Sequence, residues 1–405
     1  LHRLIRRQRQ MCIRDRMVTL RAENPYHACL VCNGEMFYIA GASNLIISGF
    51  EFKQEGPGSK PLIMQIAEDS HHIVVENNVF HDTYNNDLLK IGHAPYKIVI
   101  RNNIFYNNAY HQHQVDINGG ARDIEFTDNI LFNDFKGSGR DVIINNPWIV
   151  IKTSLHEIAP GTTNHINIRR CIFLNYQSAD AAGSFISLGK DGGTHEEFSD
   201  ICIENCLFLF NSEYKFSGAI QLNRGKNITI RNNTFYGKEP HRHFFLTSHG
   251  KSTGNPCGVK IYNNIFASPA GSIGKFSGTD DNNYEGEILD CNLFWNMSSS
   301  SNEDFSMWKD KNRIIADPML PPLEDVILPR WDREKGSFLS GNTTIREEFI
   351  RLARMYGAPK KGSKAIGAAK AENAPVDDIL GRVRNAWKSR PDIGAFETDG
   401  VEVKN

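Results

Sequence analysis

Acidic, basic and amide side chains recur at equivalent places in the first half of the chain. Gln65, Lys90 and Asp116 each stand eight residues before the first isoleucine of the apolar segment that follows. A lysine can act as a general base when its surroundings bring its pKa toward the working pH. If equivalent places in successive segments lie over one another, these three side chains form one row that can transfer protons and hold a polar substrate.

Other polar residues extend this row and surround it. Ser187 and Gln221 stand at equivalent places farther along the chain, and the intervening loops are rich in histidines, amides and carboxylates. We expect catalytic roles for Lys90, Asp116, Asp87 and Arg140. We expect substrate contacts from Gln65, His93, His111, His113, Gln114, Asn118, Ser187 and Gln221.

Two interpretations of Lys90 and Asp116 remain open at this point. In the first, Lys90 is a base: partial burial would lower its pKa, whereas neighbouring carboxylates would raise it. Arg140 or a histidine would then neutralise an acidic substrate or donate to the departing oxygen. In the second, Lys90 and Asp116 only pair across adjacent strands, which contributes from a few tenths of a kcal/mol to about 1 kcal/mol.

Hydrolysis and metal binding make different demands on the same residues. A glycoside hydrolase needs two carboxylates about 5–9.5 Å apart, and Asp87 with Asp116, or Asp82 with Asp116, could supply them. His111 and His113 could share one face of a strand as metal ligands. Because no third ligand is identified, we expect loop histidines there and assign no metal site.

The elements that must position these residues belong to a repeat. The repeated phrase has isoleucine at its first and third places, two asparagines at its fifth and sixth, and phenylalanine at its last, as in Ile98–Phe105. Two strands meeting at an asparagine bend explain the phrase, because Asn tolerates the left-handed region. A third strand precedes each phrase. Repeats of about 26 residues with variable loops indicate a solenoid of about nine coils, whose strands form three parallel sheets.

Both ends depart from the repeat. Residues 1–16 are rich in arginine and lack any strand or helix period, so we expect a sequencing artefact or a disordered tail. Residues 17–300 are predicted to form the coils and residues 301–405 a loop-rich cap. Thr344 and Glu347 form a capping-box pattern, which predicts one short amphipathic helix on the last coil or beside it.

The repeat, over roughly residues 40–300, resembles the right-handed parallel β-helix proteins of the pectin-lyase-like superfamily. The ending Arg390-Pro-Asp-Ile-Gly-Ala-Phe-Glu397 resembles that of many secreted bacterial members. The usual Ser-Pro-Ala-Ile-Asp is Ser363-Lys-Ala-Ile-Gly367 here, so the role of that Asp is in doubt. The resemblance implies an all-β right-handed parallel β-helix with a substrate groove along the sheet that carries the row. It also implies that a lyase of this kind would use Lys or Arg as base, often with calcium.

These observations predict an exported protein that acts on an acidic polysaccharide, most plausibly a polysaccharide lyase. A non-catalytic glycan-binding or cell-surface β-helix and a glycoside hydrolase are the alternatives. With 46 Lys and Arg against 47 Asp and Glu, the chain lacks the basic excess of a nucleic-acid binder. We expect no membrane span, a monomer, and calcium as the one conceivable cofactor.

Overall fold

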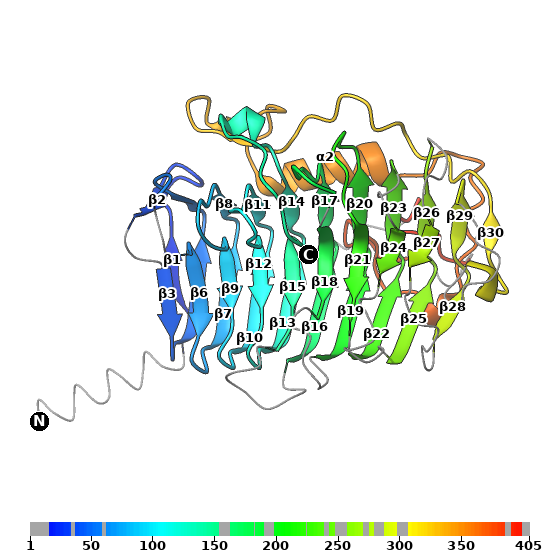
Figure 1. Ribbon diagram of the computed structural model, residues 1–405, viewed down its shortest axis with the longest axis horizontal. Helices are drawn as coiled ribbons and strands as arrows, with labels where there is room; N and C mark the ends of the chain where they lie inside the picture. The colour runs from blue at the N-terminus through cyan, green and yellow to red at the C-terminus, as the bar shows by residue number, and fades with distance from the viewer. Residues whose placement is uncertain are drawn as a thin grey trace, which may run out of the picture.

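The computed structural model describes most of the coil region and the C-terminal segment. The described residues are 16–33, 37–58, 62–153, 163–181, 183–189, 198–223, 225–238, 243–247, 257–269, 275–278, 287–297, 307–384 and 390–398. Within these ranges the chain winds through three parallel sheets that run the length of the molecule (Figure 1). The predicted all-β coil architecture is therefore confirmed.

Each coil contributes one strand to each sheet, in the order sheet C, sheet A, sheet B. Sheet A contains β1 (Val18–Arg21), β4 (Ser43–Ser48), β7 (His71–Glu76), β10 (Tyr96–Arg101), β13 (Arg122–Thr127), β16 (Asn164–Arg169), β19 (Ser199–Glu204), β22 (Lys226–Arg231), β25 (Cys257–Tyr262) and β28 (Ile288–Asp290). Sheet B contains β2 (Cys29–Cys32), β5 (Glu51–Gln54), β8 (Val79–His81), β11 (Ile104–Tyr106), β14 (Ile130–Phe132), β17 (Ile172–Leu174), β20 (Leu207–Phe210), β23 (Thr234–Gly237), β26 (Ile265–Ala267), β29 (Leu293–Trp295) and β30 (Ile314–Ile315). Sheet C contains β3 (Phe37–Ala40), β6 (Met64–Ala67), β9 (Leu89–Ile91), β12 (Val115–Ile117), β15 (Ile149–Ile151), β18 (Ser184–Leu188), β21 (Gly218–Leu222), β24 (His243–Thr247) and β27 (Lys275–Gly278).

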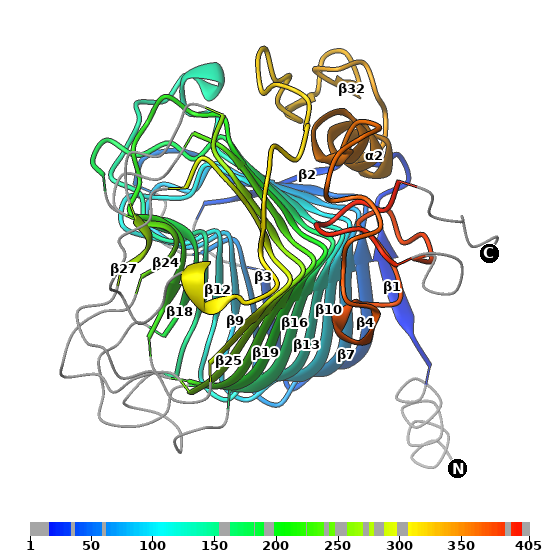
Figure 2. The same ribbon diagram turned by 90° about the vertical axis from the view of Figure 1, so that its right-hand side faces the viewer.

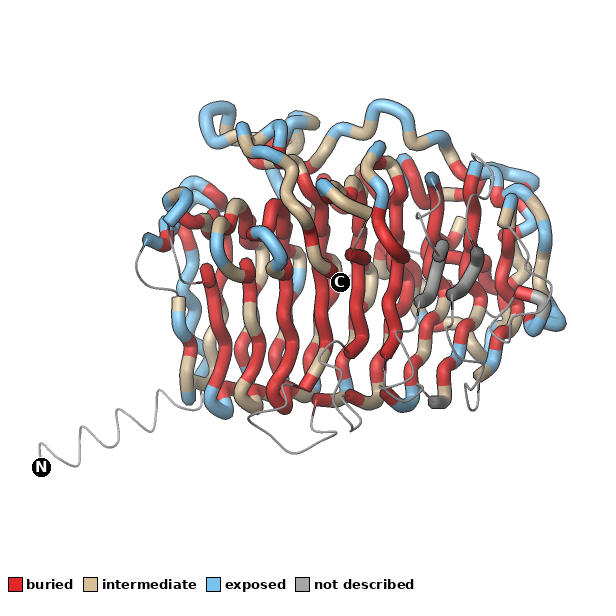
Figure 3. The backbone as a smooth tube through the Cα atoms, viewed as in Figure 1, coloured by how far each residue is buried: buried red, intermediate tan, exposed pale blue. Residues whose placement is uncertain are grey.

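The interior is filled by columns of identical or similar side chains. Ile73, Ile98 and Ile124 are in register in sheet A and are fully buried. The rings of Phe80 and Phe105 stack with their centroids 5.0 Å apart, close to the spacing of about 4.8 Å between adjacent strands. Most strand residues on the side of the molecule seen in Figure 3 are therefore buried. No coil could exclude water from this interior alone, so each is stabilised by its neighbours.

A ladder of asparagines fixes the corner between sheets A and B. Asn78 Nδ2 donates to Asn103 Oδ1 at 3.1 Å, and Asn103 Nδ2 donates to Asn129 Oδ1 at 3.1 Å. The asparagines at the bends of successive coils therefore stand in a vertical file, as stacking of the repeated phrase requires. Cys171 and Cys206 take the same place in later coils, where the Cys171 backbone N donates to Cys206 Sγ at 3.4 Å.

The outer face of sheet B is apolar and is covered by the C-terminal segment. Helix α2 (Ile345–Gly357) buries Phe349 and Leu352, and it contacts β17. The predicted capping box of Thr344 and Glu347 is present. The helix lies outside the wound strands (Figure 2) and runs over the middle coils (Figure 1), whereas we expected it on the last coil or beside it. The difference has a clear cause: outward isoleucines and leucines of sheet B, such as Ile172, would otherwise face water.

The same segment reaches back to the first coils. The hairpin β31 (Trp331–Asp332) and β32 (Ser337–Phe338) places the Trp331 ring 5.0 Å from that of Tyr26. The backbone N of Ile345 donates to Tyr26 Oη at 3.4 Å. Three short 3₁₀ helices complete the described elements: η1 (Lys136–Ser138), η2 (Met307–Lys309) and η3 (Ala371–Asn373). Among the described residues, no helix has the length and apolar character needed to cross a membrane.

Candidate functional site

The predicted row exists on the outward side of sheet C. Gln65 pairs with Lys90 and Lys90 with Asp116 in adjacent strands, in the expected register. Val150 of β15 is next to Asp116, and Ser187 and Gln221 follow it. β15 was not among the strands expected from the sequence, so the predicted row lacked Val150.

The row is more enclosed than an open groove. Asp116 is 5% exposed and Val150 is fully buried, whereas Lys90 is half-buried. Ser187 and Gln221 are also buried. Lys90, which lies next to the acidic residues, is therefore more accessible than its neighbours Gln65 and Asp116 in the row.

A pair of carboxyl groups lies beside Lys90. Asp87 is 4% exposed, and its Oδ1 accepts a hydrogen bond from the His113 backbone N at 2.7 Å. Asp116 Oδ1 accepts from Asn118 Nδ2 at 3.0 Å. Burial, followed by the negative charge of Asp116, raises the pKa of Asp87 from 3.8 to about 7, against the opposing effects of the His113 N–H, Lys90 and Lys152. The site thus contains a carboxyl group that gains and loses its proton near neutral pH, as acid–base catalysis requires.

Lys152 is a member of the site that the sequence analysis missed. Its Nζ lies 3.9 Å from Asp116 Oδ2. It follows Val150 by two residues, just as Asn118 follows Asp116, so both side chains point outward from neighbouring coils. The signal was present in the sequence as Ile149-Val-Ile-Lys152, and recognising β15 would have revealed it.

Arg140 makes its contacts in a different segment from the carboxyl pair. Its Nη1 lies 3.0 Å from Asp82 Oδ1, and its Nη2 donates to the Thr83 carbonyl at 2.8 Å. Its guanidinium also lies over the Tyr84 ring, 4.3 Å from the centroid. These contacts connect its loop to the segment after β8.

Asp82 is held in its ionised form by its partners. Burial alone would raise its pKa, but hydrogen bonding to His81 and the positive charge of Arg140 outweigh burial and lower it to about 2. His81 Nδ1 lies 2.7 Å from Asp82 Oδ2. A carboxyl group that stays ionised at neutral pH could serve only as the base or nucleophile of a hydrolase, so in a pair of Asp82 with Asp116 the general acid would be Asp116.

The remaining predicted substrate contacts are divided between the site and its surroundings. Gln114 is fully buried, and its Nε2 donates to the Phe132 carbonyl at 2.9 Å. His113 is also buried, with Nδ1 2.6 Å from the Pro147 carbonyl oxygen, so its main contribution to the site is its backbone N–H. His111 is exposed beside the ring of Tyr110, and His93 is half-buried after β9.

Among the described residues, the carboxyl groups of the site do not make up a calcium site. Calcium takes six to eight oxygen ligands. In the part of the chain that the structure describes, no group of three or more His, Cys, Asp and Glu side chains could hold a metal ion. The two carboxyl groups, Asp87 and Asp116, share their site with Lys152, whose positive charge competes with a cation.

Three stacked parallel sheets define the parallel β-helix class, and comparison with known structures gives its hand. Pectate lyase Pel9A is similar over 95% of this chain and 87% of its own, with a TM-score of 0.50 and 13% identity. At this identity the likeness establishes the fold alone: this chain is a right-handed parallel β-helix.

Two other solved structures match this chain with lower TM-scores. XylC in complex with xylose has a TM-score of 0.47 and 11% identity over 95% of this chain, which spans 65% of the XylC chain. The PL6 family alginate lyase AlyGC has a TM-score of 0.35 and 14% identity over 75% of this chain and 47% of its own. No family model matches the sequence, and no curated protein is significantly similar to it.

Proposed function

We propose that the protein is an exported carbohydrate-active enzyme that cleaves a uronate-containing polysaccharide by β-elimination. The proposal depends on one observation: Lys90 and Lys152 lie with Asp87 and Asp116 on the outward side of sheet C, and the pKa of Asp87 is about 7. The fold shared with pectate lyase Pel9A supports the proposal by analogy alone, because one fold can host many activities.

The four residues divide the work of an elimination. Lys152 attracts the carboxylate of the uronate, which stabilises the negative charge that develops when the adjacent carbon loses its proton. Lys90 takes that proton as the general base, a C=C bond forms, and the glycosidic C–O bond breaks. The departing oxygen takes a proton from water. Asp87 accepts the proton from Lys90 and restores the amine, while Asp116 keeps the pKa of Asp87 high.

The decisive measurement is the ultraviolet absorbance of unsaturated products on a panel of alginate, pectate and glycosaminoglycans. We expect at least one substrate to be cleaved, and Lys90→Ala to lower kcat by about 100-fold or more. Lys97→Asn is the matched control, because Lys97 is an exposed lysine of the same coil with φ 53°, a conformation that Asn tolerates. Its activity should equal that of the wild type.

The pH profile tests the role of Asp87. Because Asp87 must be ionised to accept a proton, kcat should rise with pH through about 7, the pKa of its carboxyl group. Asp87→Asn should remove this rise and lower kcat at pH 8. Substrate binding without cleavage by the wild type would contradict the lyase and support a glycan-binding protein. Saturated products with a new reducing end would indicate hydrolysis instead.

A further inference from the structure

The connection from β11 to β12 presents an aromatic ring to solvent beside the proposed catalytic site. This connection, residues 107–114, turns the corner between sheets B and C, where loops project from the strands (Figure 2). Asn107, Asn108 and Ala109 are buried at its start, whereas Tyr110 is 53% exposed and His111 is also exposed. The connection therefore buries its start and presents its tip.

The tip is held by the following coil on both sides. The His111 backbone N donates to the Ile144 carbonyl at 3.2 Å, and the His111 carbonyl accepts from Asn146 Nδ2. Asn108 Nδ2 donates to Asn145 Oδ1 at 2.6 Å. Three consecutive residues of the next coil thus fix the backbone around the exposed tyrosine.

Arg140 fixes the start of the same connection. Its Nη1 donates to the Asn107 carbonyl at 3.1 Å, and the Asp134 backbone N donates to Asn107 Oδ1 at 2.7 Å. Asn107 Nδ2 in turn donates to Asp82 Oδ1 at 3.0 Å. These contacts hold the connection against both neighbouring coils, so the exposed ring stands on a well-supported backbone.

The end of the connection belongs to the proposed catalytic site. The His113 backbone N donates to Asp87 Oδ1 at 2.7 Å, and Asp116 follows on β12. Tyr110 precedes His113 by three residues, so their Cα atoms are at most about 11 Å apart. A polysaccharide that passes Lys90 with several sugar residues on either side can therefore reach the tyrosine ring.

The Tyr110 ring has the chemistry needed to hold a sugar. The His111 ring lies beside it, with centroids 4.1 Å apart and planes at 68°. This edge-to-face contact favours one orientation of the tyrosine, so less conformational entropy is lost when a ligand binds. A pyranose ring has C–H groups on its faces and hydroxyl groups around its edge. Its face can pack on the aromatic ring while its hydroxyls bond with the phenol oxygen and with water.

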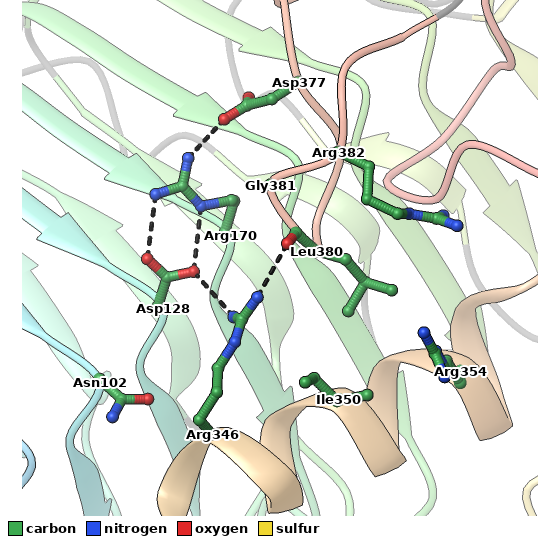
Figure 4. Close-up of a pocket in the computed structure, with 10 residues that line it drawn as sticks. All are labelled: Asn102, Asp128, Arg170, Arg346, Ile350, Arg354, Asp377, Leu380, Gly381 and Arg382. Carbon is green, nitrogen blue, oxygen red and sulfur yellow. Dashed lines mark hydrogen bonds and ion pairs between the residues drawn. The ribbon is translucent and has the colours of Figure 1, made fainter. Parts of the chain in front are cut away.

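The cavity of about 570 Å³ beneath helix α2 has a different character. Arg170 pairs there with Asp128 and Asp377, and Arg346 Nη1 lies 3.4 Å from Asp128 Oδ1 (Figure 4). Arg346 Nη2 also donates to the Leu380 carbonyl at 2.8 Å. These contacts fasten α2 and the C-terminal segment to the coils. The cavity thus joins parts of the chain, whereas the β11–β12 connection presents its ring to solvent.

We propose that Tyr110 forms a subsite in which one pyranose ring of the polysaccharide stacks on the tyrosine face. The inference rests on the proposed function for the identity of the ligand, but it requires binding and no chemical step. Because the stack is the same before and during the reaction, it lowers KM and leaves kcat unchanged.

Binding measured without turnover tests the subsite directly. Isothermal titration calorimetry uses the full chain carrying Lys90→Ala, and the probes are oligosaccharides of pectate, alginate and hyaluronan. We expect at least one probe to bind, and Tyr110→Ala to weaken its binding about five- to tenfold through loss of the aromatic stack. Tyr110→Phe keeps the ring and should bind within about twofold of the background protein.

Ile315→Ala is the matched control, because Ile315 is 59% exposed in β30, at the end of sheet B far from β11. It should leave binding unchanged. In the cleavage assay, Tyr110→Ala should raise KM by a similar factor without changing kcat or its pH profile.

Three results would overturn the subsite. They are binding of no probe, equal binding by the background protein and its Tyr110→Ala variant, and a lowered kcat with an unchanged KM. The last is expected if the tyrosine only supports the connection that orients Asp87. If the wild type cleaves no polysaccharide while Tyr110→Ala still weakens binding, the proposed reaction is wrong and the subsite stands.

Discussion

Replacing Asp87 by Asn should stabilise the protein while impairing its proposed reaction. In the folded protein the Asp87 carboxyl keeps its proton up to about pH 7, whereas in the unfolded chain it loses the proton near pH 3.8. Between these values the unfolded chain binds fewer protons than the folded protein, so stability falls as pH rises. Asn carries no titrating group and keeps an oxygen that can accept from the His113 backbone N–H.

The size of the effect follows from that interval. About three pH units at about 1.36 kcal/mol each correspond to about 4 kcal/mol of stability lost by the wild type above pH 7. Structural relaxation around Asp87 and Asp116 recovers part of this, so we expect Asp87→Asn to be more stable by about 2–4 kcal/mol at pH 8. At pH 4, where Asp87 is protonated in the folded protein, the difference should nearly vanish.

Guanidinium unfolding followed by circular dichroism between pH 4 and 8 measures this difference. Asp123→Asn is the matched control: Asp123 is exposed, and its φ of 54° suits Asn. The control should follow the wild-type curve at every pH. If Asp87→Asn is no more stable than the wild type at pH 8, ionisation of the buried Asp87 carboxyl group does not destabilise the folded protein as we infer.

Three further predictions concern the ladder, the metal and the His81 cluster. Asn103→Ala removes the acceptor that lies 3.0 Å from the Asn78 backbone N, and it should lower the free energy of unfolding by about 2–5 kcal/mol. A loss below about 1 kcal/mol would show that the asparagine hydrogen bonds do not stabilise the fold. Treatment with EDTA should leave the cleavage rate unchanged. If EDTA abolishes cleavage and added calcium restores it, the protein does bind a cation that its reaction needs. Burial lowers the pKa of His81, but Asp82 and Glu51 outweigh burial and raise it. Its stabilising contribution is therefore present at low pH and lost as pH rises through the raised pKa, and His81→Gln should flatten that part of the stability–pH curve.

The sequence predicted those features that depend on one residue per repeat. Equal numbers of residues separate Gln65, Lys90 and Asp116 from the strand that follows each of them, and their expected register is confirmed. The same repeat spacing places Asn78 next to Asn103. Spacing alone determines which side chains are neighbours, because parallel stacking leaves no freedom in register once the apolar columns are aligned.

Burial and loop contacts could not be predicted in the same way. The enclosure of Asp116 and the pairing of Arg140 with Asp82 depend on loops of unequal length that have no repeating pattern. The raised pKa of Asp87 depends on that enclosure, so its titration near neutral pH was invisible in the sequence. The position of α2 could have been inferred from the outward isoleucines of sheet B, which require a cover.

The return of the C-terminal segment to Tyr26 sets the order in which the molecule can be completed. The contact between Tyr26 and Ile345 joins residues 319 positions apart, so it cannot form until most of the chain has been synthesised. Coils can stack as they emerge, but the apolar flank of sheet B stays open to water and to other chains until the last quarter arrives. A truncation before α2 should therefore yield stacked coils that aggregate through this flank, and a cell that makes the protein gains by keeping the nascent chain shielded until its end is released.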